Sequence, residues 1–269
     1  KGEHEQCFAY THNTASDKNG FVLAHETVPG NVHDSVSFDK VRKKVMDKFK
    51  DKITFEVLDA GYKTPAICRT ILEDGKIPLL PYVRPKGSKD LMNKKEYTYN
   101  KEKDIYICPK GETLQYSTVT KEGYKIYKSN IEKCMKCPLK EQCTKSQINQ
   151  KSISRHVWQE YVDYTNELRY TEVWKESYPL RKETVERIFA ECKENMGLRF
   201  TRVKGLEKNR CNATMIFTCH NLKKLALWNW KSKKNASPNV SISSNFVQII
   251  KYSIKKLEYF FKYTNLSTI

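Results

Sequence analysis

The chain has 269 residues, and its hydrophobic fraction of 39% is enough for a globular core, which excludes a disordered chain. Lys and Arg total 49 against 31 Asp and Glu, so the formal net charge is +18. Such a surplus favours nucleic acid as the partner, because binding to phosphates releases counterions. A membrane partner is disfavoured, since no apolar run approaches the roughly 18 residues of a spanning helix.

Residues 1–84 are expected to form an α/β layer arrangement in the order β-β-α-β-α-β. The expected elements are strands over 6–16 and 21–28, a helix from Asp34 or Ser35 to about Phe49, a strand over 53–59, a helix from Thr64 to about Glu73 and a strand over 77–83. Asp17-Lys-Asn-Gly20 supplies the turn between the first two strands. The first helix is expected to bury its apolar positions, which are Val36, Val41, Val45 and Phe49.

The third strand, Ile53-Thr-Phe-Glu-Val-Leu-Asp59, ends on a carboxylate. Because side chains alternate along a strand, Asp59 shares a face with Phe55 and Val57, which are core-type residues. One interpretation is ordinary turn chemistry, since Asp before Ala-Gly can bond its own backbone. The other is a functional carboxylate at the C-terminal end of a strand.

Residues 85–155 differ in character, because they are rich in Lys and Tyr and poor in aliphatic residues. They contain Cys108, Cys134, Cys137 and Cys143, and four thiolates can close a tetrahedral zinc site. A structural metal would supply folding energy that a small core cannot. Four reduced thiols or a redox Cys-x-x-Cys are the alternatives, although nothing nearby resembles a thioredoxin-like unit. The other five cysteines, Cys7, Cys68, Cys192, Cys211 and Cys219, are expected to be reduced core residues.

Helices are expected over about 156–176, where Val157, Tyr161 and Tyr164 have helical spacing, and over Lys182–Asn195. In the second of these, Glu186 lies at the edge of the apolar face and Lys193 projects to the same side two turns later. Glu186 could enter an active-site cleft, although a lone Glu is more commonly part of a solvated face.

These residues and their order resemble the DDE transposases of bacterial insertion sequences, in the branch with a four-cysteine insertion. The resemblance rests on Pro29-Gly-Asn-Val-His-Asp34-Ser, on Asp59-Ala-Gly-Tyr after a strand, and on Tyr178-x-x-Arg181 ahead of Glu186 and Lys193. The run from Arg202-Val-Lys-Gly-Leu206 to Asn221-Leu-Lys-Lys-Leu225 is similar to the family's closing helices, so the resemblance covers about 1–230.

The resemblance implies an RNase H-like mixed sheet with flanking helices, interrupted by a Cys-rich insertion. The domains are then 1–84 and 156–230 for the catalytic core, 85–155 for the zinc-binding insertion, and 231–269 for a basic linker and amphipathic tail helix. Asp59 and Glu186 would be the second and third acids, holding Mg²⁺ or Mn²⁺. Tyr178, Arg181 and Lys193 would contact DNA phosphates.

The implied partner is double-stranded DNA, at element ends and at the target, with a homo-oligomer in the DNA complex. The implied location is the cytoplasm of a bacterium, in association with the nucleoid.

Two departures from the family pattern stand out. The family's first aspartate is expected on a strand upstream of Lys1, so the chain would be an incomplete catalytic core. Four residues separate Arg181 from Glu186, where the family usually has three. Two alternatives to an active transposase stay open: a non-catalytic DNA-binding zinc module, which would be a transposase relic, and a metal-dependent nuclease on the same fold.

Overall fold

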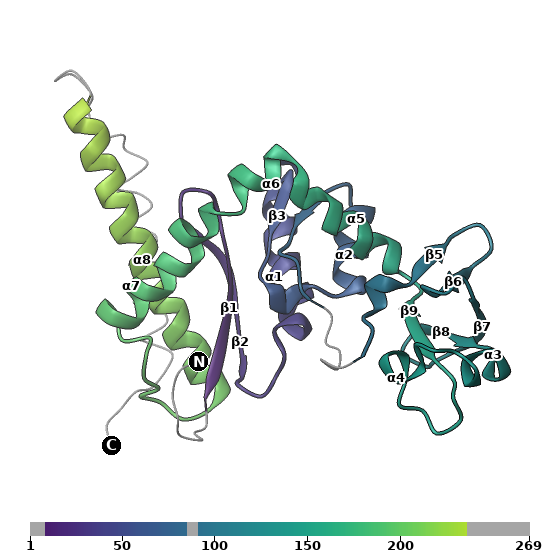
Figure 1. The fold of residues 1–269 in the computed structure, drawn as a ribbon. Coiled ribbons are helices and arrows are strands. Elements are labelled where there is room, and N and C mark those ends of the chain that lie inside the picture. Colours follow the sequence, from purple (N-terminus) through teal and green to yellow (C-terminus); the bar gives the residue numbers. More distant parts are fainter. Residues whose placement is uncertain (1–8, 85–90, 236–269) are drawn as a thin grey trace. The chain divides into compact units, whose positions relative to one another are not determined.

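The computed structural model describes residues 9–84 and 91–235, with side chains for all of these except 232–235. Residues 9–84 form two small sheets and two helices (Figure 1). The elements are β1 (Tyr10–Ser16), β2 (Val22–Pro29), α1 (Asp34–Phe49), β3 (Phe55–Val57), α2 (Pro65–Glu73) and β4 (Ile77–Leu79). Their types and order are those expected from the sequence.

Strands β1 and β2 form an antiparallel hairpin in which Thr14 pairs with His25. Its turn is built by Asp17, whose Oδ1 accepts hydrogen bonds from the backbone N–H groups of Asn19 (3.0 Å) and Phe21 (2.7 Å). Gly20 supplies the positive φ of 80° that this turn requires. The predicted hairpin is therefore confirmed over the described residues.

Helix α1 has a different buried face from the one expected. Val36 is 66% exposed, whereas Phe38 is only 4% exposed. The inward stripe runs through Phe38, Val41 and Val45 at i, i+3 and i+7, and Val36 lies on the opposite side of the helix. The N-cap is also not Asp34 or Ser35 but His33, whose Nδ1 accepts from the Ser35 N–H (3.3 Å).

Strands β3 and β4 form a separate parallel pair, so the described residues contain two two-stranded sheets where one mixed sheet was expected. The predicted core face of β3 is wrong at Phe55, which is 39% exposed. The partly buried Leu58, which directly follows this short strand, instead packs against the cluster of Phe38 and Ile71.

A buried ion pair fixes β3 to α1. The Arg42 guanidinium makes two hydrogen bonds to the Glu56 carboxylate through Nε (3.0 and 3.1 Å) and one through Nη2 (2.8 Å). Both side chains are about one-tenth exposed. Arg42 also pairs with Asp74, which follows α2. The segment that leads to Asp59 is therefore held by charge as well as by packing.

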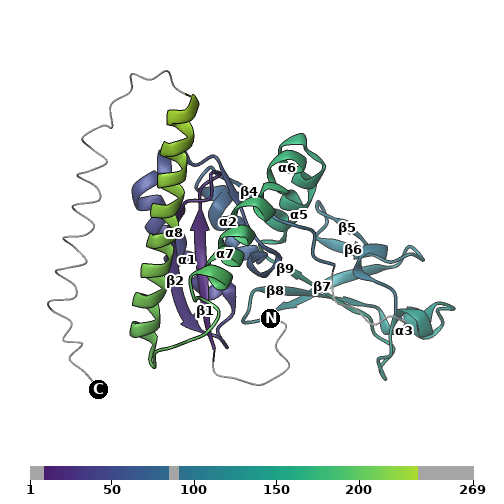
Figure 2. The same ribbon diagram turned by 90° about the vertical axis from the view of Figure 1, so that its left-hand side faces the viewer.

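The Cys-rich segment forms a five-stranded antiparallel sheet in the order β5-β6-β7-β8-β9. Its strands are β5 (Thr98–Asn100), β6 (Ile105–Ile107), β7 (Thr113–Val119), β8 (Tyr124–Ser129) and β9 (Ser152–His156), and its short helices are α3 (Ile131–Met135) and α4 (Lys140–Cys143). Figure 2 shows α3 beside one end of this sheet.

Tyrosines build the core of this sheet, although the segment was expected to have only a small core for want of aliphatic residues. Tyr97, Tyr106, Tyr127, Leu114 and Ile153 are buried together. The hydroxyls of Tyr99 and Tyr127 both donate to Asp104 Oδ1 at 2.6 Å. These two hydrogen bonds, that of Tyr127 most of all, lower the pKa of Asp104 to about 2.

The remaining elements are helical. They are α5 (Gln159–Glu167), a 3₁₀ turn (Leu168–Tyr170), α6 (Glu172–Ser177), a π-helical turn (Lys182–Glu186), α7 (Arg187–Asn195) and α8 (Leu206–Asn235). Val157 and Tyr164, whose helical spacing predicted the first of these helices, are 41% and 50% exposed, and Thr165 is buried. Val157 precedes α5 and follows β9, a strand that the sequence pattern did not predict.

The chain divides into two compact units, residues 1–218 and 219–269. In the first unit, Ala213, Ile216 and Phe217 of α8 pack with Ile188 and Cys192 of α7. The second unit is described only as the continuation of α8 to Asn235, so the expected tail helix lies outside the described residues. Cys7, in the first unit, lies outside them as well. No described helix is long and apolar enough to cross a membrane.

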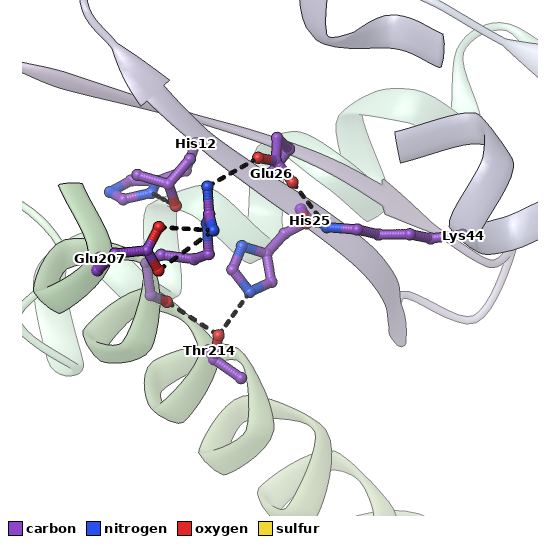
Figure 3. Close-up of polar contacts among 8 residues, drawn as sticks. His12, His25, Glu26, Lys44, Glu207 and Thr214 are labelled. Atoms are coloured by element: carbon purple, nitrogen blue, oxygen red, sulfur yellow. Dashed lines mark hydrogen bonds and ion pairs between the residues drawn. The ribbon is translucent and has the colours of Figure 1, made fainter. Parts of the chain in front are cut away.

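A buried carboxylate joins β2 to α1 and to the first part of α8 (Figure 3). Glu26 is 6% exposed and pairs with Lys44 (2.7 Å) and Arg210 (3.2 Å). Burial by itself raises the pKa of Glu26, but the hydrogen bond and charge of Lys44, together with Arg210, outweigh it and lower that pKa. Beside it, His25 contacts the Thr214 hydroxyl at 2.9 Å.

Candidate active site

Asp59 lies two residues beyond the end of β3, at the start of the 3₁₀ turn Ala60–Tyr62. Its Oδ1 accepts a hydrogen bond from the Ala60 N–H (2.6 Å), so the turn chemistry expected for this residue is present. The side chain is nevertheless half exposed, and its Oδ2 points to a second partner. One oxygen shapes the loop and the other remains available for a cation.

Glu186 ends the π-helical turn Lys182–Glu186, directly before α7. The expected single α-helix over Lys182–Asn195 is therefore a π turn followed by an α-helix. Ile188 and Cys192 anchor α7, since they are 2% and 0% exposed. Glu186 itself is half exposed.

Arg181 brings the two candidate acids together. Its Nη1 lies 3.3 Å from Asp59 Oδ2, and its Nη2 lies 2.8 Å from Glu186 Oε1. The Arg181 side chain is only 19% exposed, although both carboxylates are half exposed. Two carboxylates from segments more than 120 residues apart in the chain thus share one cation. Such an arrangement concentrates negative charge where a metal ion could replace the guanidinium.

Tyr178 borders the same pair. Its ring stacks on Trp174, with centroids 4.6 Å apart and an interplanar angle of 6°. Burial raises the pKa of Tyr178, the Arg181 charge opposes this, and the charges of Asp59 and Glu186 add to the rise. The phenol therefore stays protonated beside the carboxylates and can donate a hydrogen bond.

Lys193 is not part of this group among the described contacts. Its Nζ lies 6.0 Å from the Phe189 ring centroid. Its charge also lowers the pKa of His12 on β1, after burial and His25. Of the residues proposed from the sequence, the structure therefore brings Tyr178, Arg181, Asp59 and Glu186 together and leaves Lys193 on the neighbouring turns of α7.

Asp34 and Tyr62 are further neighbours of this site, although Asp34 was expected only as a helix cap and Tyr62 only as part of the Asp59-Ala-Gly-Tyr run. A Cβ added to Gly61 would lie 3.3 Å from Asp34 Oδ2, so the Asp59 loop passes directly beside Asp34. Burial raises the pKa of Tyr62 to about 12, and the charges of Asp34 and Asp59 contribute. The Tyr62 hydroxyl donates to Asn13 Oδ1 (3.0 Å), which ties the loop to β1. In the sequence, the Gly61-Tyr62 pair after Asp59 was the available signal that this loop packs closely against its neighbours.

The four cysteines of the predicted zinc site line one cavity of about 220 Å³, together with Tyr97, Ser129 and Lys133. In this arrangement two of the thiols have other partners. Cys134 Sγ donates to Ser129 Oγ (3.1 Å), and Cys143 Sγ lies 3.0 Å from the Tyr97 hydroxyl.

Across residues 9–84 and 91–235, no three His, Cys, Asp or Glu side chains are placed to hold a metal ion. Cys108, Cys134, Cys137 and Cys143 have the soft donor atoms that zinc prefers, but their thiols would have to move closer together to hold an ion. The zinc site stays a prediction. Among the other cysteines, Cys68 and Cys192 are buried as expected, whereas Cys219 is exposed.

A family model described as a transposase DDE domain matches residues 107–226. The match covers less than half of the chain, begins in β6 and includes Tyr178, Arg181, Glu186 and Lys193, whereas Asp59 precedes it. Comparisons with curated proteins and with solved structures give no match. The family match supports a DDE transposase, which is a nucleotidyl transferase acting on DNA.

Proposed function

We propose that the chain is the catalytic core of a DDE transposase, which nicks and joins DNA at the ends of a mobile element. Asp59 and Glu186 would be two of its metal ligands. The observation that carries the proposal is the Arg181 bridge, because it joins the two carboxylates that the family resemblance selects. The family match at residues 107–226 supports the same reaction class.

The donor chemistry of the pair fits divalent cations. Asp59 and Glu186 offer hard anionic oxygens, which Mg²⁺ and Mn²⁺ prefer, and both are half exposed. Bound ions would activate the attacking hydroxyl and stabilise the leaving oxygen. A third carboxylate, which the family resemblance implies, would complete the set. Arg181 would then leave the carboxylates and join Tyr178 and Lys193 in contacting DNA phosphates.

We further propose that residues 9–84 belong to an RNase H-like fold and that the Cys-rich sheet carries a structural zinc. The element order and the position of Asp59 after β3 support the first point. The cavity shared by Cys108, Cys134, Cys137 and Cys143 supports the second. Four protein ligands would leave no open coordination position, so this zinc would take no part in catalysis.

A non-catalytic DNA-binding zinc module is the second candidate. The observation that favours it is the absence, among the described residues, of a third acid placed with Asp59 and Glu186 to hold a metal. Such a module would bind DNA and zinc but would not cut.

The deciding experiment is a nicking assay with the full-length protein, on a supercoiled plasmid that carries the element end. We expect Asp59→Asn and Glu186→Gln each to abolish Mg²⁺-dependent nicking. Glu183→Gln is the matched control, because Glu183 is an exposed acid in the same π turn. Nicking that survives both substitutions rules out the catalytic assignment, and a wild type that binds DNA without nicking it supports the second candidate.

A further inference from the structure

Three cations from three segments surround the ring of Tyr82. Lys95 Nζ lies 4.5 Å from the ring centroid, Arg169 Cζ lies at 4.7 Å and Lys63 Nζ at 5.9 Å. Tyr82 follows β4, Lys95 precedes the Cys-rich sheet and Arg169 lies in the 3₁₀ turn after α5. Cation–π contacts of this kind hold the cations in place, but they do not neutralise their charges.

None of these cations pairs with a carboxylate within the described part of the chain. Lys63 Nζ donates to the Pro81 carbonyl (2.7 Å) and to Asn166 Oδ1 (2.6 Å), which are neutral acceptors. Arg169 has one acceptor there, the Tyr170 hydroxyl at 3.3 Å, and its Nε is buried without a partner. The buried Tyr82 hydroxyl also has none.

Other arginines stacked on aromatic rings in this protein are neutralised. Arg155 lies 4.1 Å from the Tyr99 ring centroid and pairs with Asp163 at 2.9 Å. Arg69 lies 4.5 Å from the Trp158 ring centroid and pairs with Glu73 at 2.7 Å. The uncompensated charge around Tyr82 is therefore a local property and not a general feature of these stacks.

The positive charges around Tyr82 also repel one another. Burial, opposed by Cys68 and assisted by the nearby positive charge of Arg169, lowers the pKa of Lys63 to about 8. An anion between the cations would remove this repulsion and would accept hydrogen bonds from the unused N–H groups of Arg169. A phosphate group suits such a fork of donors.

We propose that Lys63, Lys95, Arg169 and Tyr82 form a phosphate-binding site for the DNA backbone. The inference rests on the proposed function, because it assumes a DNA strand at Asp59. Lys63 is four residues from Asp59, so the two Cα atoms are at most about 14 Å apart. At a rise of about 3.4 Å per base pair, this corresponds to about four base pairs along the duplex. The site would hold the strand beside the carboxylates, on the side that leads to Lys95 and the Cys-rich sheet.

The test is the salt dependence of DNA binding by the full chain, measured by fluorescence anisotropy on a labelled duplex. The test protein is the double variant Lys95→Gln/Arg169→Gln, which spares the hydrogen-bonded Lys63. The matched control is Lys52→Gln/Lys121→Gln, because both of these lysines are exposed and the substitution removes the same net charge. Lys95→Gln alone, at an exposed position, is a second test variant. Melting curves establish that the wild type, the two test variants and the control are all folded.

We expect the slope of log K against log salt concentration to become shallower by about 2 in the double variant, by about 1 in Lys95→Gln and by less than 0.5 in the control. A double variant with the slope of the control overturns the site but leaves the proposed function intact. A wild type without salt-dependent DNA binding overturns both. Inorganic phosphate distinguishes the two sources of the anion: if it raises the melting temperature of the wild type but not of the double variant, while the two proteins have the same salt slope for DNA, the site binds free phosphate and the DNA assignment is wrong.

Discussion

Replacing Arg42 by Met tests how strongly the buried ion pair with Glu56 holds the segment before Asp59. Met keeps the apolar length of the side chain but removes the charge, which leaves Glu56 only 11% exposed and without its counter-ion. Removing one partner of a fully buried pair costs about 3–5 kcal/mol. Because both side chains retain about a tenth of their exposure, we expect the lower end, about 3 kcal/mol of unfolding free energy. Asp74 is 45% exposed and should contribute little to this loss.

The measurement is urea-induced unfolding followed by circular dichroism. Lys101→Met is the matched control, since its pair with Glu160 joins side chains that are 84% and 59% exposed, and we expect it to cost less than about 0.5 kcal/mol. In the double variant Arg42→Met/Glu56→Gln, most of the loss should be recovered, because the orphaned charge is gone. A loss below about 1 kcal/mol for Arg42→Met, or no recovery in the double variant, would refute the reasoning that an uncompensated charge is the cause.

Three further predictions concern the metal sites and the partly buried His12. Arg181→Ala should strengthen Mn²⁺ binding in a thermal-shift titration, because the guanidinium no longer competes for the carboxylates of Asp59 and Glu186; unchanged or weaker binding would contradict this. Protein isolated without added metal should contain about one zinc per chain by elemental analysis, and Cys134→Ser should lose it; metal-free wild type would contradict the zinc proposal. The pKa of His12 is lowered from 6.5 to about 4, first by burial and then by His25 and Lys193, so the unfolded state binds the proton more readily. The corresponding stability is complete above pH 6.5 and is lost as the pH falls toward 4, by about 2 kcal/mol after allowance for partial exposure, and urea unfolding of His12→Gln should lack this loss.

The sequence predicted the elements whose periodicity is strong, but it did not determine which residues they bury. The hairpin and helices α1 and α2 follow from turn residues, caps and apolar spacing. Val36 was assigned to the core because it is apolar, yet α2 packs on this helix through Phe38 and β2 packs on it through Val41. Periodicity constrains a helix to have one buried face, and tertiary contacts select which face it is.

The sheet of the Cys-rich segment was missed for a different reason. Counting aliphatic residues suggested that only a small core was available, but tyrosines can bury their rings while their hydroxyls find acceptors. Tyr99 and Tyr127 do so through Asp104, a residue with a positive φ of 49° at the tip between two strands. Neither the acceptor nor its backbone conformation has a signature in the local sequence pattern.

The candidate site shows how a departure in spacing can be compensated by backbone geometry. In an α-helix, residues five apart are offset by about 140° around the axis, so Glu186 would point away from Arg181. A π-helical turn bonds residue i to residue i+5, and Lys182–Glu186 is such a turn. The extra residue is thereby absorbed, and Arg181 Nη2 still lies 2.8 Å from Glu186 Oε1. Because π turns are rare and frequently occur at functional sites, the position of this turn between Arg181 and Glu186 supports a role for their contact in the site.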